Sequence, residues 1–140
     1  MRAPYTQLYL HLVWATRDRL PLLVPQAQST AYDSLRAECE QMGAEALAIG
    51  GMPDHVHLLV RFPTTVCVAG LVKQVKGASS RLLSLRLAED GYPFRWQGGY
   101  GAFTVSRSHV SPVRAYIANQ ERHHAGGSLL SMLEPPVAGE

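Results

Sequence analysis

The chain has 140 residues, of which 46% are hydrophobic and 17% are charged, a composition typical of a folded globular domain. The formal net charge of +2 excludes a polycation, so the position of each basic residue matters more than the total. No segment approaches the roughly 20 apolar residues of a membrane span, and the N-terminus has no signal-peptide core. The two cysteines fit no disulfide framework. We expect one cytoplasmic domain with a core at about residues 7–125 and a short tail at 126–140.

The first half of the chain predicts a strand, a helix and a second strand. Residues 7–16 are rich in β-forming residues, and their alternation places Leu10 and Leu12 on one face and His11 on the other. Pro25 starts a segment with apolar residues at helical spacing, and Gly43 marks its end. Residues 44–50 predict the short second strand, and "GGMPD" predicts a tight turn.

The second half begins with the clearest alternation in the sequence. In the strand expected at 55–62, Val56 and Leu58 share one face, while His55 and His57 share the other. A long helix is expected at 66–91, and a fourth strand is expected near 100–106. A final helix follows, with Ser111 as N-cap, Pro112 at its first position and Gly126 as its stop.

This order of elements, β-α-β-β-α-β-α, predicts an α+β fold of the ferredoxin-like or RRM-like class, built on a split βαβ motif. In that plan the first and third strands are the central pair of an antiparallel sheet, and the helices lie on one face. We therefore expect the opposite face to be open and to collect His55, His57 and His11.

The spacing of His55 and His57 permits three interpretations: a metal site, a catalytic acid–base pair, or two imidazoles that face solvent. Residues i and i+2 of a strand point the same way, with Cβ atoms roughly 6 to 7 Å apart, so both rings can reach one divalent ion. Two ligands are too few, and a third must come from elsewhere.

The final helix carries a pair that fits this need. Tyr116 and Gln120 are four residues apart and share one helix face, although ordinary surface helices contain such pairs often. A Gln carbonyl oxygen is a suitable ligand beside two imidazoles, and a phenol beside the metal suggests attack on a phosphodiester. A phosphotyrosine ester keeps the energy of the broken diester, so a free 3′-OH can reverse the step without ATP.

Five segments together resemble a known family: "HLVWATRDRLPLL", "GGMPDHVHLLV", "LVKQVKGASSRLL", "FRWQGGYGAFTVS" and "VRAYIANQERHH". Their order and spacing are similar to those of the small single-tyrosine HUH transposases of the insertion-sequence 200/605 type and their repeat-associated relatives. The resemblance covers roughly residues 7–125, and the combination of H-V-H with Y-I-x-N-Q is its specific part.

The resemblance implies a role for each of these residues. His55, His57 and Gln120 would be ligands of Mg²⁺ or Mn²⁺, and Tyr116 would be the nucleophile of a DNA transposase. The substrate would be single-stranded DNA with hairpins at the element ends, cleaved through a 5′-phosphotyrosine. A homodimer with active sites shared between subunits is also implied, with no membrane association. Three further residues are expected to support the site: His11, Asn119 and His123.

Several basic and aromatic residues are candidates for contacts with DNA phosphates and bases, each of which is otherwise an ordinary surface residue. They are Arg17, Lys73, Lys76, Arg81 and Trp96. The tail at 126–140 is shorter than the further helix that family members commonly carry, which bears on how the tyrosine helix is regulated.

Two other functions stay open at this point. An RRM-like sheet can bind single strands without catalysis, but it needs aromatic platforms on its central strands, where this chain has His55 and His57. A hydrolytic phosphoesterase needs more ligands or a second histidine motif, and only one H-x-H is present.

Overall fold

The computed structural model describes residues 4–87 and 94–120 of the chain. Four strands and three α-helices follow one another, with two short 3-10 turns. Their bounds in chain order are β1 (Tyr9–Ala15), η1 (Arg17–Arg19), α1 (Pro25–Gln41), β2 (Glu45–Met52), β3 (His55–Arg61), α2 (Val68–Leu87), β4 (Gly101–Val105), η3 (Arg107–His109) and α3 (Val110–Ala118).

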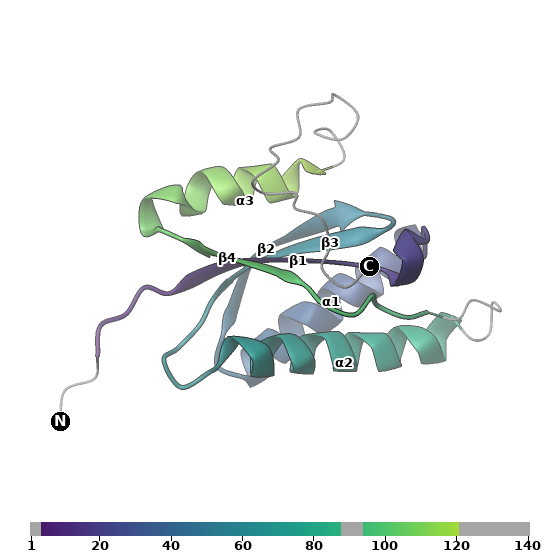
Figure 1. The fold of residues 1–140 in the computed structure, drawn as a ribbon, viewed down its shortest axis with the longest axis horizontal. Helices are drawn as coiled ribbons and strands as arrows, with labels where there is room; N and C mark the ends of the chain where they lie inside the picture. Colours follow the sequence, from purple (N-terminus) through teal and green to yellow (C-terminus); the bar gives the residue numbers. More distant parts are fainter. Residues whose placement is uncertain (1–3, 88–93, 121–140) are drawn as a thin grey trace.

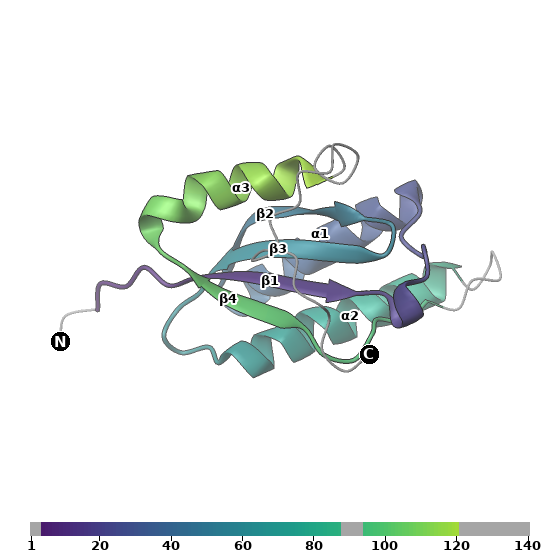
Figure 2. The same cartoon turned by 45° about the horizontal axis from the view of Figure 1, so that its top comes forward.

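The strands form one antiparallel sheet in the order β2-β3-β1-β4 (Figure 2). The central pair is β1 and β3, with Leu12 opposite Leu58 and Val13 opposite His57. This confirms the predicted ferredoxin-like α+β fold, including its central strands. The alternation of side chains along β1 and β3 then decides which residues each face of the sheet receives.

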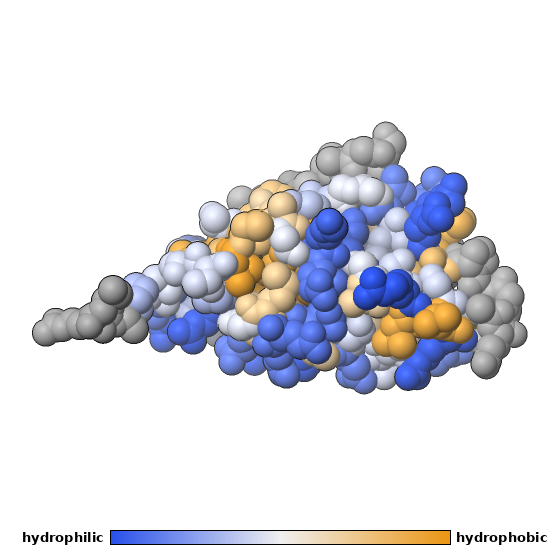
Figure 3. All heavy atoms as spheres, turned by 90° about the horizontal axis from the view of Figure 1, so that it is seen from below, coloured by the Kyte–Doolittle hydropathy of each residue, from blue (hydrophilic) through white to orange (hydrophobic). Residues whose placement is uncertain are grey.

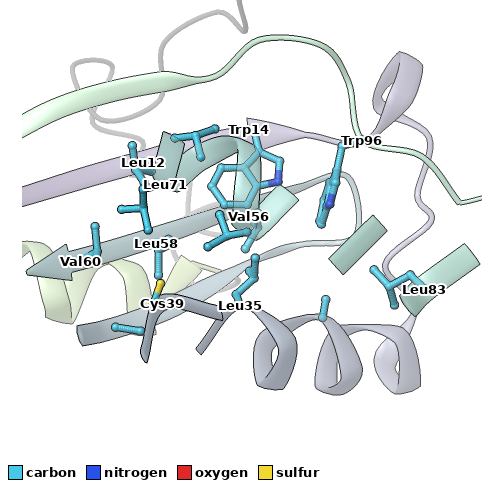
Figure 4. Close-up of a cluster of buried hydrophobic side chains, with 14 of the residues drawn as sticks. Leu12, Trp14, Leu35, Cys39, Val56, Leu58, Val60, Leu71, Leu83 and Trp96 are labelled. Carbon is cyan, nitrogen blue, oxygen red and sulfur yellow. The ribbon is translucent and has the colours of Figure 1, made fainter. Parts of the chain in front are cut away.

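Helices α1 and α2 lie side by side on one face of the sheet, below it in Figure 1. The buried apolar side chains between them and the sheet form the main hydrophobic core (Figure 4). Each fully buried leucine there contributes about 2 kcal/mol through the apolar surface removed from water. The labelled core residues are Leu12, Trp14, Leu35, Cys39, Val56, Leu58, Val60, Leu71, Leu83 and Trp96.

The sequence also indicated the ends of α1 correctly. Pro25 occupies the first turn, where its missing N–H breaks no helical hydrogen bond. Gly43 follows the helix with a φ of 78°, a left-handed conformation that glycine adopts without steric cost. The long second helix, expected at 66–91, runs over Val68–Leu87, and positions 88–91 lie outside the described residues.

The opposite face of the sheet is covered in part, so the expectation of an open face is corrected over β2 and β3. Helix α3 lies across it, over β2 and β3 (Figures 1 and 2). Its Val113 and Ile117 pack on Leu59 of β3 in a second, smaller apolar cluster. The histidine side of the sheet is therefore covered by the last helix, while the two long helices share the other side.

Helix α3 also comes unusually close to β2. A Cβ atom added at Gly50 would lie 2.3 Å from the carbonyl oxygen of Ile117, so only a glycine permits this approach. The helix begins one residue before the predicted N-cap Ser111, because the 3-10 turn η3 continues directly into it from His109. Pro112 still lies in the first turn, and the predicted stop at Gly126 falls outside the described residues.

Candidate active site

The two histidines of the H-x-H motif lie near the start of β3, on the face that α3 covers. His55 is 2% exposed and His57 is fully buried. Their ring centroids are 5.2 Å apart, with the planes at 74°. The predicted pairing of the two rings on one side of the strand is therefore present, but the rings are enclosed by protein instead of facing solvent.

The C-terminal end of α3 brings Tyr116 to this place, and Gln120 follows it one helical turn later. The Tyr116 ring stands edge to face on the His57 ring, with centroids 6.0 Å apart. Gln120 comes just after the helix and is 2% exposed. Its amide nitrogen donates to the Tyr116 carbonyl oxygen at 3.4 Å, so the amide oxygen is the atom that would bind a cation.

His57 is held from the neighbouring central strand. Its Nδ1 atom lies 2.7 Å from Nε2 of His11 on β1, a hydrogen bond between two buried rings. The rings are also stacked, with centroids 5.0 Å apart and planes at 25°. His11 contacts Phe103 of β4 on its other side. The structure thus places His11 where the sequence predicted, directly behind His57.

His55 is held from the turn that precedes it. Its Nδ1 atom lies 2.8 Å from a carboxylate oxygen of Asp54, and Arg19 donates to the other carboxylate oxygen at 3.3 Å. Burial by itself raises the pKa of Asp54, but the His55 hydrogen bond and charge, together with Arg19, outweigh it and lower that pKa below its ordinary value. Asp54 therefore stays an ionised acceptor for the imidazole.

The backbone before Arg19 is unusual. Asp18 and Arg19 both have a φ of 54°, in the left-handed region that residues with a Cβ adopt only at a cost of roughly 1 kcal/mol or more. The Asp18 N–H is held by the Gln97 side chain at 2.8 Å. This conformation turns the chain at the end of β1 so that the Arg19 guanidinium reaches Asp54.

These contacts fit a cation site to which His55 and His57 contribute two imidazoles. Since Nδ1 of each ring is engaged, by Asp54 or by His11, Nε2 is the nitrogen that each histidine would present. A second hydrogen bond of this kind is the usual way in which a metal-binding histidine is oriented. Within residues 4–87 and 94–120 no three His, Cys, Asp or Glu side chains group together as a metal site, so Gln120 would be needed as the third ligand.

The predicted DNA-contacting residues are not gathered at this site. Lys73 and Arg81 are exposed on α2, on the other side of the sheet, where the surface is largely hydrophilic with separate hydrophobic patches (Figure 3). Arg17 is exposed after β1 and pairs with Asp18 at 3.8 Å. Their contacts with DNA stay predictions.

Two other candidates have structural contacts instead. Trp96 is only 6% exposed, donates from Nε1 to Ser79 at 2.9 Å and packs against Trp14. A ring buried in this way cannot stack on a base, so the predicted role of Trp96 is corrected to one in the core. The Lys76 ammonium donates to the carbonyl oxygens of Gln97 and Gly99, and burial lowers its pKa.

Two residues that were expected to support the site, Asn119 and His123, remain to be placed. Asn119 is the C-cap of α3, and its side chain donates to the Ala115 carbonyl oxygen at 2.8 Å. His123 lies outside the described residues. Asp54 was predicted only as part of the turn before β3. An acid directly before an H-x-H strand could have indicated a hydrogen-bond partner for the first histidine. Arg19 could not be found in this way, because no local pattern links Arg19 to Asp54, 35 positions away.

A ferredoxin-like sheet with an H-x-H strand beneath a tyrosine-bearing helix defines the class of single-tyrosine transposases. The sequence model of the family described as "Transposase IS200 like" matches residues 4–120, and the chain belongs to this family. Among curated relatives, the ISDra2 transposase TnpA of Deinococcus radiodurans is 33% identical over 118 residues, covering 81% of this chain and 84% of that protein. The IS200 transposase of Salmonella typhimurium is 26% identical over 129 residues, covering 89% and 84%.

Solved structures agree with this assignment. A crystal structure from Deinococcus radiodurans R1 described as a transposase has a TM-score of 0.70 and 33% sequence identity, covering 86% of this chain and 95% of that one. A REP-associated tyrosine transposase bound to a REP hairpin has a TM-score of 0.63 at 14% identity, covering 92% and 74%, and supports the fold. The family therefore assigns this chain a transposase activity, which requires DNA cleavage. None of the helices in the described ranges is long and apolar enough to cross a membrane.

Proposed function

We propose that this chain cleaves and rejoins single-stranded DNA through Tyr116, with a 5′-phosphotyrosine as the intermediate. The observation that carries the proposal is the packing of the Tyr116 ring on His57, beside the buried rings of His11 and His55. Burying several polar side chains together does not stabilise a hydrophobic core, because each polar group loses its hydration and must be hydrogen-bonded to offset that cost in free energy. Such a group of residues therefore indicates a functional site.

The reaction balances with the groups that this chain supplies. The Tyr116 phenolic oxygen attacks the scissile phosphorus and forms a new O–P bond, while the bond from phosphorus to the 3′ oxygen breaks. The phenol loses its proton, and the departing 3′ oxygen takes one up as a free hydroxyl. A phenol has an ordinary pKa of about 10, so positive charge near the oxygen is needed to favour its ionised form. Attack by a 3′-OH on the phosphotyrosine reverses the exchange.

The residues that would hold Mg²⁺ or Mn²⁺ are His55, His57 and Gln120. A divalent cation bound there supplies positive charge to the phosphate oxygens and stabilises the charge that develops on them. Other residues of the chain orient these ligands: His11 is hydrogen-bonded to His57, and Asp54 is hydrogen-bonded to His55. Helix α3 positions the Tyr116 ring beside His57, and the side chains of all three histidines are buried.

We also propose DNA with hairpin ends as the substrate and a homodimer as the working form. The hairpin is supported by the REP-associated neighbour, which was solved with a REP hairpin. The homodimer follows from the resemblance to family members that share active sites between subunits. Within the single chain described here, α3 packs on its own sheet. Light scattering of the purified chain is expected to give the mass of two chains.

The proposal is tested by incubating the protein with 5′- and 3′-labelled single-stranded DNA that carries candidate hairpin ends. With Mg²⁺ or Mn²⁺ we expect a denaturant-resistant adduct that retains the label 3′ to the cut, together with a fragment ending in a free 3′-OH. The adduct should be absent with EDTA and absent in Tyr116→Phe. The matched control is Tyr100→Phe, since Tyr100 is a partly buried tyrosine packed against the core on the other side of the sheet.

The alternatives give different results in the same experiment. A non-catalytic single-strand-binding module would retain the DNA without an adduct on any end sequence. A hydrolytic phosphoesterase would continue to cleave after Tyr116→Phe. Either result contradicts the proposal, while loss of the adduct in Tyr116→Phe alone supports it.

A further inference from the structure

A second feature lies on the same face of the sheet as Tyr116, at the other end of α3. It is a pocket of about 330 Å³ with three arginines in its wall, Arg61 from β3, Arg107 from η3 and Arg114 from α3. We call it the arginine pocket. Its remaining lining residues are Tyr9, Glu45, Leu47, Val110 and Ser111.

The positive charge of the arginine pocket is not neutralised by the acidic side chains that line it. Glu45 is the one acid in its wall, so the pocket carries a net excess of two positive charges. Glu45 is opposite Arg61 in the β2–β3 pairing, yet in the described part of the chain no ion pair engages any of the three arginines. Their guanidinium groups are exposed and available to an anion from solution.

The position of the pocket relates it to the active site. Arg61 is four residues beyond His57 on the same side of β3, which corresponds to roughly 13 Å along the strand. Tyr9 is two residues before His11 on the same side of β1. Pocket and active site therefore lie along one continuous face of the sheet, with α3 running from one to the other.

We infer that the arginine pocket binds the backbone of the single-stranded DNA at a nucleotide a few positions away from the one that Tyr116 attacks. This inference rests on the proposed function, since it concerns the substrate of that reaction. A separation of roughly 13 Å corresponds to about four stacked nucleotides at 3.4 Å each.

The chemistry of the pocket wall fits a nucleotide better than a free anion. Guanidinium groups pair with phosphate oxygens through two parallel hydrogen bonds. Beside them, Leu47, Val110 and the Tyr9 ring offer apolar and aromatic surface to a base or sugar. A volume of about 330 Å³ is at the lower end of the range for small organic ligands.

The test is the affinity of single-stranded DNA for the full chain, measured by fluorescence anisotropy of a labelled 20-nucleotide thymidine strand at several salt concentrations. The measurement uses the Tyr116→Phe background with EDTA, so it needs no cleavage. Arg61→Gln and Arg107→Gln are compared with Arg86→Gln, which removes the same charge from an exposed residue at the end of α2. Thermal melting of each variant checks that it is folded.

We expect Arg61→Gln and Arg107→Gln each to weaken binding about tenfold and to reduce the slope of log affinity against log salt by about 0.7, the value for one lost phosphate contact on a single strand. Arg86→Gln should change neither. Equal losses in all three variants, or no loss in the first two, would overturn the inference.

The result also separates this inference from the proposed function. If wild-type protein forms no adduct but binding depends on Arg61 and Arg107, the phosphotyrosine proposal fails and the arginine pocket stands as a DNA-binding site. If the adduct forms and neither arginine affects binding or its salt dependence, the pocket is excluded while the proposed function stands.

Discussion

The two faces of the central strands, β1 and residues 55–60 of β3, are buried to a similar extent but hold different chemistry. Beneath α1 and α2, Leu12 and Leu58 meet across the central strands among other apolar side chains. Beneath α3, the alternate positions of the same two strands carry His11 and His57, hydrogen-bonded to each other. Both rings have no more exposure than the leucines beside them.

Burial of the central strands therefore serves two purposes. On the α1–α2 face, burial removes apolar surface from water and stabilises the fold. On the α3 face, burial lowers the local dielectric around polar groups, which strengthens their hydrogen bonds and their effect on a phosphate charge. Neighbouring residues of one strand belong to opposite faces of the sheet. Substitutions at adjacent positions can therefore separate an effect on stability from an effect on activity.

The largest expected contrast is between His57 and Leu58. Leu58→Ala opens a cavity in the main core and should reduce the free energy of unfolding by about 3 kcal/mol, with adduct formation per folded molecule nearly unchanged. His57→Gln keeps a polar side chain that can still bond His11, but it removes an imidazole that we propose as a metal ligand. We expect it to lower adduct formation by at least about 100-fold and to cost less stability than Leu58→Ala. Urea unfolding and single-turnover cleavage measure the two effects. Similar activity losses in both variants would contradict the division between faces.

A smaller effect is expected where α3 meets β2. Gly50→Ala places a Cβ against the Ile117 carbonyl oxygen, so α3 must move away from the sheet and carry Tyr116 with it. A displacement on the order of 1 Å can cost about 100-fold in rate, so we expect a loss of adduct formation of roughly 10- to 100-fold with the main core intact.

The control for Gly50→Ala is Gly77→Ala, in the exposed middle of α2 with no atom within 4 Å of the added Cβ. That variant should gain roughly 0.5–1 kcal/mol of stability and keep full activity. Near-UV circular dichroism, which reports the packing of the tyrosine ring, should change in Gly50→Ala alone. Unchanged activity in Gly50→Ala would mean that the position of α3 against β2 does not set the position of Tyr116.

The smallest expected effect concerns a thiol on the α1–α2 face. Burial raises the pKa of Cys39 from 9.0 to about 11, with Arg36 partly opposing it. Because the unfolded chain releases this proton first, the contribution of Cys39 to stability is complete below about pH 9 and is lost as the pH rises to about 11, at about 1.4 kcal/mol or less for each pH unit.

Urea unfolding between pH 8 and pH 11 measures this loss, with Cys39→Ala as the comparison. The variant is less stable at every pH because of the smaller side chain, but its stability should fall less steeply over this range. Tyr32, whose pKa burial raises to about 12, titrates in both proteins and cancels in the comparison. Parallel curves would show that the core accepts a thiolate at position 39.

The arrangement of the sheet could be predicted from the sequence because it depends on local alternation and on the order of the elements. The period of two along β1 and β3 assigned Leu12, Leu58 and the three histidines to their faces, and the order of elements fixed the central pair. The contact of Tyr116 with His57 was indicated by residue types together with family resemblance, since no local pattern joins positions 59 residues apart.

What could not be predicted depends on contacts between distant segments. In the sequence, Trp96 lies between a basic residue and a glycine-rich segment, a context typical of the protein surface. It is buried because its backbone forms a β-bridge with Thr16 and its indole donates a hydrogen bond to Ser79. Val113 and Ile117 are four residues apart on α3, a spacing that is typical of an apolar helix face but does not show that this face packs on the histidine side of the sheet. That packing depends on the close approach at Gly50.

Helix α3 has one consequence beyond covering the site. It begins at Val110, which lines the arginine pocket, and carries Tyr116 six residues later. A helix rises 1.5 Å per residue, so these points are separated by about 9 Å along its axis whatever the DNA sequence. If the arginine pocket binds a phosphate and Tyr116 makes the cut, as we propose, the helix would set a constant number of nucleotides between the two. One inserted residue between Val110 and Tyr116 would rotate the tyrosine by about 100° about the helix axis, so that it no longer faces the histidines when the pocket is occupied.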